Sequence, residues 1–170
     1  MPHHGVAVTV PQPWSTTLQQ AREEVGDPMA SAIPPHVTLL PPTAILPEHM
    51  DAFLTHLRSV TAPVEAFDMV LSGTGTFRPV SPVVFVQVSR GIPNCEALER
   101  AVRSGPVERT LDFPYHPHVT VAHHLDEPAL DRAFDSLDTF RCSFRVASVE
   151  LYHHDNDGVW RAVESFPLGG

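Results

Sequence analysis

Lysine is absent from this sequence of 170 residues, and arginine supplies all 11 basic side chains. Without lysine the chain can offer neither a Schiff-base nucleophile nor the lysine of a Walker loop. The basic residues are outnumbered by 20 acidic ones, which gives a formal net charge of −9 at pH 7. Proteins that hold long nucleic acids rely on a basic surface that displaces counterions. The composition therefore argues against a long nucleic-acid partner and leaves a nucleotide or an RNA end open.

Cysteine is scarce, and the two present, Cys95 and Cys142, lack the spacing of a zinc site or a disulfide framework. We expect both to be reduced structural thiols. No apolar run approaches the roughly 20 residues of a membrane helix, and the N-terminus does not read as a signal peptide. A Gly-x-Ser-x-Gly elbow is missing, so a serine hydrolase has no support. We expect a soluble, cytoplasmic protein with no membrane partner.

Proline and glycine punctuate an alternation of strand-like and helix-like segments. We expect Ser15 or Thr16 to cap the first helix, Asn94 to cap the third, and the proline pair 41–42 to close the second strand. The glycine-rich stretch 72–79 is expected to be a loop. The expected strands are 5–10, 36–40, 64–71, 83–88, 118–123, 144–152 and 159–166, and the expected helices are 14–25, 47–60, 94–103 and 126–137.

Both halves of the chain read strand, helix, strand, helix, strand, which is a repeat of topology rather than of sequence. Halves related in this way usually pack about an approximate two-fold axis. We therefore expect one α+β domain over residues 1–170, bilobal, with lobes of about 1–80 and 81–170. Its mainly antiparallel sheets should carry helices on their outer faces and enclose a central cleft. The last strand should return through a hairpin turn at 155–158, and we expect a monomer.

The tetrapeptide Pro-His-Val-Thr occurs twice, at 35–38 and 117–120, in equivalent strands of the two halves. Because side chains alternate faces along a strand, each copy places its histidine and threonine on one face and its valine on the other. The histidine and the threonine are then roughly 6.5 to 7 Å apart at the backbone. Two such pairs that face each other across the cleft can enclose one phosphate.

Paired histidines suit displacement at a phosphodiester, because imidazoles with a pKa near 6.5 can hold opposite protonation states at neutral pH. One accepts a proton from the attacking water or hydroxyl, and the other donates a proton to the leaving oxygen. The threonine hydroxyls can donate hydrogen bonds to the non-bridging oxygens. This chemistry needs no metal, and we expect no cofactor. The plain alternative is that both histidines are half-buried strand residues without a chemical role.

The two segments, with Leu39 after the first and Val121 after the second, resemble the paired His-x-Thr motifs of the two-histidine phosphoesterase superfamily. Within it the chain is most similar to the 2′-5′ RNA ligase and cyclic phosphodiesterase branch, over essentially its whole length. That family has a duplicated bilobal α+β fold. The proline pair after Leu40 departs from the aromatic residue and glycine that many relatives carry, which affects the rim of the cleft.

The resemblance implies roles for four residues. His36 and His118 correspond to the acid and base pair, with His36 as the acid and His118 as the base. Thr38 and Thr120 correspond to the residues that bind the phosphate.

Other candidates lie outside the motifs. Phe77 and Tyr115 could stack on a nucleobase, and Arg78 could supply a cation for the phosphate. Packing within loops or exposure to solvent would account for each of them equally well. The histidine pairs 123–124 and 153–154 invite a metal site, but neighbours on a strand point to opposite faces. We therefore expect no metal site.

These residues together predict a metal-independent phosphodiesterase that hydrolyses 2′,3′-cyclic phosphates of nucleotides or RNA ends. Two alternatives stay open. The same acid and base would catalyse formation of a 2′-5′ linkage, because a catalyst serves a reaction in both directions. A protein that binds phosphorylated RNA termini would keep the cleft without turnover, although the presence of both histidines and both threonines argues against it.

Overall fold

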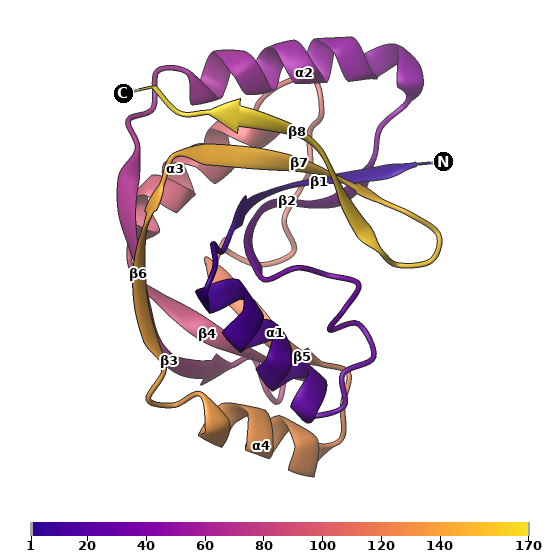
Figure 1. Cartoon of the computed structure of the whole chain (residues 1–170). Helices are drawn as coiled ribbons and strands as arrows, with labels where there is room; N and C mark the ends of the chain where they lie inside the picture. The colour runs from indigo at the N-terminus through magenta and orange to yellow at the C-terminus, as the bar shows by residue number, and fades with distance from the viewer. Residues whose placement is uncertain (1, 170) are drawn as a thin grey trace.

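Two four-stranded antiparallel sheets form the framework of the protein (Figure 1). The computed structural model describes residues 2–169. The first sheet has the order β2-β1-β7-β8 and consists of β1 (His3–Thr9), β2 (His36–Ala44), β7 (Ser148–His154) and β8 (Trp160–Pro167). The second sheet has the order β5-β4-β3-β6 and consists of β3 (Phe67–Thr76), β4 (Val83–Arg90), β5 (His118–His123) and β6 (Arg141–Val146).

Each sheet is covered by helices from both halves of the chain. Helix α1 (Trp14–Glu24) follows β1 of the first sheet but packs against β5 of the second, and α3 (Ile92–Arg103) follows β4 of the second sheet but packs against β2 of the first. Helices α2 (Pro47–Thr61) and α4 (Glu127–Ser136) lie at opposite ends of the molecule, over β8 and over β3 to β5 respectively (Figure 1). This crossed arrangement repeats in the two halves, and the predicted duplicated α+β fold is confirmed.

The strands that carry the two motifs, β2 and β5, are edge strands of their sheets and lie beside each other. Contrary to the prediction, β2 continues through Pro41 and Pro42 to Ala44. Proline has no N–H to donate, but an edge strand pairs on one side only and can tolerate it. The pairing of β1 with β2 also shifts register between His4 and Val6, opposite this stretch. The edge position explains why two prolines do not end the strand.

The predicted strand 144–152 is wrong, because it consists of two strands in different sheets. Strand β6 ends at Val146 and pairs with β3, whereas β7 begins at Ser148 and pairs with β1. The chain therefore crosses from one sheet to the other at Ala147. For the same reason a boundary near residue 80 does not separate the sheets, since β3 belongs with β4 to β6 while β7 and β8 belong with β1 and β2.

The glycine-rich stretch after Leu71 is partly strand rather than the predicted loop. Strand β3 runs to Thr76, and its register with β4 shifts between Leu71 and Thr74. Gly73 lies within this irregularity with a φ of +72°, a conformation that side chains disfavour. A bulge at glycine thus lets the strand continue where composition predicts a loop.

Two predicted helix caps are absent from the structure. Neither Ser15 nor Thr16 caps α1, and the side chain of Gln12 instead accepts a hydrogen bond from the backbone N–H of Thr16 at 3.1 Å. Helix α3 begins at Ile92 after Gly91, whose φ is +101°, so Asn94 lies inside the helix. Helix α1 nevertheless begins at Trp14 as predicted, whereas α3 begins two residues before the predicted start at Asn94.

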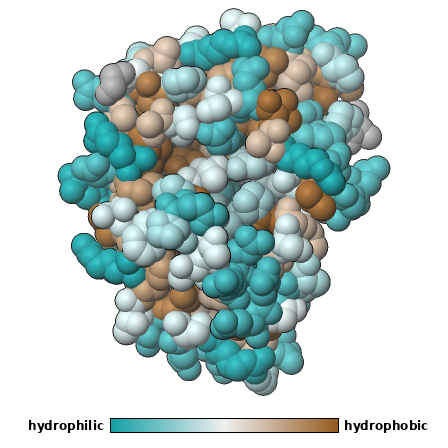
Figure 2. Space-filling view, viewed as in Figure 1, coloured by the Kyte–Doolittle hydropathy of each residue, from teal (hydrophilic) through white to brown (hydrophobic). Residues whose placement is uncertain are grey.

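The core lies between the sheets and the helices that cover them, and it includes Cys95 and Cys142. Both are free thiols, as predicted. The face of the molecule in Figure 2 is a mosaic of hydrophilic and near-neutral residues with small, scattered hydrophobic areas. None of the helices between residues 2 and 169 is long and apolar enough to cross a bilayer.

Candidate active site

The two motif strands show the same pattern of burial. Their valines, Val37 and Val119, are completely buried. Their histidines and threonines keep partial contact with solvent: His36, Thr38, His118 and Thr120. The predicted alternation of faces is therefore present in both copies, and each histidine shares a face with its threonine.

Both histidines are held by the same hydrogen bond. Nδ1 of His36 lies 2.7 Å from the carbonyl oxygen of Pro34, and Nδ1 of His118 lies 2.6 Å from the carbonyl oxygen of His116. A carbonyl can only accept, so each Nδ1 carries the hydrogen and donates it. In the neutral ring the lone pair is then on Nε2, which is the atom left to exchange a proton.

The two threonines differ in their partners. The Oγ1 of Thr38 lies 3.1 Å from Nε2 of His36, where it can donate to the neutral imidazole. The hydroxyl of Thr120 has no hydrogen-bond partner among residues 2–169. Both hydroxyls can turn their hydrogen toward an anion beside the histidines, Thr38 by exchanging one partner for another.

The pKa of His36 is lowered to about 4, chiefly by burial and also by nearby positive charge on Arg22 and on His118, while the hydrogen bond to the Pro34 carbonyl opposes the shift. Burial also lowers the pKa of His118, against the carbonyl of His116, which raises it. In the unliganded protein both imidazoles are therefore neutral at pH 7. The two motifs therefore lie close together: β2 and β5 are adjacent, and His118 is near enough to His36 to affect its pKa.

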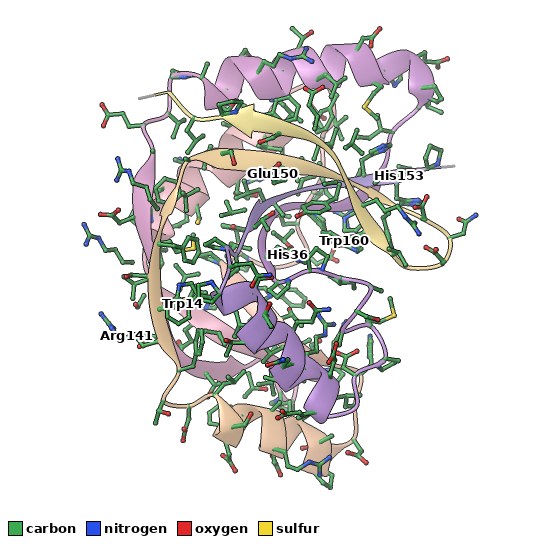
Figure 3. The ribbon with its side chains drawn as sticks, viewed as in Figure 1. Trp14, His36, Arg141, Glu150, His153 and Trp160 are labelled. Atoms are coloured by element: carbon green, nitrogen blue, oxygen red, sulfur yellow. The ribbon has the colours of Figure 1, made fainter. Side chains whose placement is uncertain are left out.

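Aromatic rings surround both histidines, but in different geometries. The indole of Trp160 from β8 covers His36 with ring centroids 4.4 Å apart and an angle of 32° between the planes, and Figure 3 shows the two side by side. His118 meets the ring of Phe77 at 5.0 Å and 89°, which is an edge-to-face contact, and that of Phe85 at 5.1 Å. Nothing in the local sequence around residue 160 indicates the contact with His36.

A cavity of about 720 Å³ opens next to the second motif, and His118, Thr38, Phe77 and Tyr115 are among the residues that line it. The remaining lining is mostly apolar and holds no arginine. The Tyr115 hydroxyl donates to the backbone carbonyl of Thr38 at 2.7 Å and so ties the loop before β5 to β2. Burial raises the pKa of Tyr115. The predicted stacking candidates thus both face one apolar space beside His118.

Arg78, the predicted cation for the phosphate, is paired with acidic side chains in this structure. Its Nη1 donates to Glu127 at 3.0 Å and to Asp131 at 2.8 Å, both on α4, and its Nε donates to Thr76 at 3.1 Å. These two carboxylates raise the pKa of Arg78 and neutralise its charge. It is not among the residues that line the cavity at His118.

Arg22 is the cation whose charge reaches His36, and sequence reasoning missed it. It is 7% exposed, and its Nε donates to Asp27 at 2.7 Å. Asp27 is 5% exposed and also accepts the backbone N–H of His123 at 3.3 Å. A charged residue within the apolar stripe of α1 was the available signal, because a buried arginine needs a partner.

The histidine pairs were only partly anticipated. His123 and His124 do not point apart, since their rings stack at 3.7 Å. His124 follows the end of β5 and has a φ of +55°, so the alternation rule no longer applies to it. His153 and His154 do diverge, toward His4 and toward Trp160. Across residues 2–169, no three histidine, cysteine or acidic side chains gather in a metal-binding arrangement.

A model of the 2′-5′ RNA ligase superfamily matches residues 10–158, a span that includes both motifs. The chain belongs to this superfamily. The predicted two-histidine phosphoesterase family is thereby confirmed. A Bacillus licheniformis protein provisionally named a phosphoesterase is 30% identical over 151 residues, which cover 84% of this chain and 85% of the relative.

Solved structures share the fold of this 2′-5′ RNA ligase superfamily member over its whole length. The crystal structure of TT0787 from Thermus thermophilus has a TM-score of 0.69 at 20% identity and covers 99% of this chain and 98% of its own. That of Escherichia coli LigT with 3′-AMP has a TM-score of 0.64 at 19% identity and covers 100% of both chains. LigT has also been solved with ATP, NADP+ and phosphate. At this identity the likeness establishes the fold.

Proposed function

We propose that this protein is a metal-independent phosphodiesterase that opens the 2′,3′-cyclic phosphates of nucleotides or RNA ends. The observation that carries the proposal is the matched anchoring of His36 and His118. Each donates Nδ1–H to the carbonyl two residues before it, on adjacent edge strands, so that two Nε2 atoms are available at one place. Membership of the 2′-5′ RNA ligase superfamily supports phosphoester chemistry at this pair.

The two imidazoles would act in one displacement. Nε2 of His118 accepts a proton from water as the water oxygen forms a bond to phosphorus. The bond from phosphorus to one ribose oxygen breaks, and Nε2–H of His36 donates its proton to that oxygen. The product is a 2′- or 3′-phosphomonoester with a free neighbouring hydroxyl. Thr38 and Thr120 donate hydrogen bonds to the non-bridging oxygens, where negative charge builds up.

Substrate would supply the charge that sets the protonation states. Both histidines are neutral at pH 7 without a ligand, because burial lowers their pKa values. A bound phosphodiester is an anion and raises the pKa of an imidazole beside it. One of the pair can then hold the proton that the leaving oxygen needs. A low intrinsic pKa makes His36 a strong donor once it has taken up a proton from solvent beside the bound phosphodiester anion.

The apolar cavity beside His118 would receive the nucleobase. Phe77 and Tyr115 line it, and aromatic rings stack on bases with little preference for sequence. The lining holds no arginine, so the cavity suits an uncharged ring better than a second phosphate. The 3′-AMP complex of LigT agrees with a nucleotide ligand for this fold. We do not assign Arg78 to the phosphate, because Glu127 and Asp131 already pair with it.

Incubation with the four 2′,3′-cyclic nucleotides, followed by phosphorus NMR of the products, tests the proposal. We expect conversion to one phosphomonoester isomer by the wild type and none by His118→Ala. His49→Ala, which removes an exposed histidine on α2, should match the wild type. Tight binding without conversion would instead indicate a binding protein. Formation of a phosphodiester between two nucleotides in place of a phosphomonoester would identify ligation, the reverse chemistry, as the activity.

A further inference from the structure

Trp160 is the residue that covers His36, although it comes from the far end of the chain. The centroids of the two rings are 4.4 Å apart and their planes differ by 32°, so the faces of the rings lie against each other (Figure 3). The indole is half-buried and is the first residue of β8. It has no role in the acid and base mechanism proposed above, in which only the histidines and threonines of the two motifs take part.

The backbone fixes where Trp160 lies. Its N–H donates to the carbonyl of Ala32 at 2.9 Å, in the loop that leads into β2 and carries Pro34. The β7–β8 turn before it contains Gly158 at a φ of +81°, and Arg161 pairs with Asp155 of the same turn. Trp160 therefore connects β8 to the loop that contains Pro34, whose carbonyl accepts the hydrogen bond from Nδ1 of His36.

The indole of Trp160 also packs against residues of neighbouring strands. Tyr152 and His154 of β7 lie 5.7 Å and 5.9 Å from it, measured between ring centroids. The indole also lies against β1, since a Cβ built on Gly5 would be in ordinary contact with Cη2 of Trp160 at 3.7 Å. The ring position is set by neighbours on β7 and β1 as well as by His36.

We propose that Trp160 is a positioning residue for His36, whose indole face fixes the imidazole plane and stabilises its protonated form. A cation within about 6 Å of an indole face is attracted to the electrons of the ring. The consequence for turnover rests on the proposed function, whereas the effect on the imidazole itself does not.

The surroundings of His36 give this contact its importance. Arg22 from α1 and His118 from β5 both disfavour a positive charge on His36, and the Pro34 carbonyl is the group that favours it. No carboxylate among residues 2–169 acts on this imidazole. An indole face can stabilise the protonated imidazole and leave Nε2–H free for a phosphate. A carboxylate would compete with the phosphate for that N–H. His118 has no indole partner among residues 2–169, and among the rings beside it are those of Phe77 at 89° and Phe85 at 55°.

Fluorescence gives a direct measure of the contact, because a protonated imidazole against an indole quenches its emission. The chain has two tryptophans, and Trp14 packs against Phe140 at 6.3 Å. In a Trp14→Phe background, emission from Trp160 should fall as the pH is lowered through the pKa of His36. His36→Asn should abolish this step and His154→Asn should retain it. A step that persists without His36 would overturn the assignment.

Two replacements of Trp160 distinguish the effect of an aromatic face on His36 from the effect of covering His36 with any apolar side chain. Leucine and phenylalanine both keep an apolar cover, and phenylalanine alone keeps an aromatic face. Measured by NMR titration of the imidazole, the pKa of His36 should fall by roughly 0.5 to 1 unit in Trp160→Leu and by less in Trp160→Phe. Removing cover alone would admit water and raise the pKa, so an unchanged or higher pKa in Trp160→Leu refutes the proposal.

Kinetic measurements test whether the contact between Trp160 and His36 affects turnover. In Trp160→Leu the limb of the kcat/KM profile that belongs to His36 should move to lower pH by the same amount as the NMR titration, with kcat reduced more than KM is raised. A uniform loss at every pH would mark Trp160 as merely structural. Absence of turnover by the wild type would defeat the proposed function and leave the fluorescence and NMR tests unaffected.

Discussion

Acidification should destabilise the wild-type protein more than a variant in which His36 is replaced by asparagine. Asparagine keeps a side-chain N–H that can donate to the Pro34 carbonyl, which lies 2.7 Å from Nδ1 of His36, but it cannot titrate. The comparison therefore isolates the cost of placing a proton on a buried imidazole. The other histidines with lowered pKa values titrate in both proteins and cancel: His4, His118 and His123.

The magnitude follows from the difference between the folded and unfolded pKa values. The pKa of His36 is about 4 when folded, against 6.5 for the unperturbed group. Between these values the unfolded chain takes up the proton first, so stability is fully present above pH 6.5 and declines as the pH falls toward 4. An interval of about 2.5 units at about 1.4 kcal/mol per unit gives about 3 kcal/mol. This is an upper value, because the side chain keeps partial contact with solvent.

Urea denaturation followed by circular dichroism measures the effect. The free energy of unfolding of each protein is extrapolated to water at several pH values between about 7 and about 4. The wild-type value minus the His36→Asn value should fall by up to about 3 kcal/mol over this range. A difference that stays constant, or that grows as the pH falls, would refute the argument that His36 is held neutral by burial.

Four further outcomes are expected. Asp27→Asn should destabilise the protein by about 3 to 5 kcal/mol in urea denaturation, because it leaves the buried Arg22 guanidinium without its partner; a loss under about 1 kcal/mol, the size of a surface ion pair, would contradict this. Thr38→Val and Thr120→Val should each lower kcat on a cyclic nucleotide by a factor on the order of 10², as one lost donor to a developing anion does; wild-type rates would remove the hydroxyls from the mechanism. Turnover should survive EDTA, and loss on chelation restored by zinc would instead implicate a metal. The bell-shaped kcat/KM profile should peak below pH 6.5, the unperturbed value, because burial lowers both imidazole pKa values in the free protein; a maximum above pH 7 would show that the free imidazoles are not depressed.

Local patterns in the sequence predicted much of the fold. Strand β5 has the predicted bounds, and α4 starts after Asp126, whose side chain accepts the N–H of Ala129 at 2.9 Å. Both depend on signals within a few residues. The crossing at Ala147 also has a local signal that the prediction overlooked. The alternating buried residues have even numbers up to Val146 and odd numbers from Val149.

The rest of the site depends on residues far apart in the chain. Trp160 reaches His36 only because β8 folds back beside β7, and Arg22 acts on His36 only because α1 packs against the opposite sheet. Arg78 was a reasonable candidate as a cation in a glycine-rich stretch. The position of α4 gives it two carboxylate partners instead. Such contacts are set by tertiary packing, which no short window of sequence encodes.

The central claim is that His36 and His118 donate and accept one proton each at a single phosphodiester, and leaving-group rescue tests it most directly. On a 2′,3′-cyclic nucleotide, His36→Ala and His118→Ala should each lower the rate by roughly 10² to 10⁴, and the double variant by far less than the product. On a phosphodiester with a nitrophenolate leaving group, which needs no proton, His36→Ala should regain activity and His118→Ala should stay inactive. Wild-type rates in either single variant on the cyclic nucleotide would contradict the two-histidine mechanism.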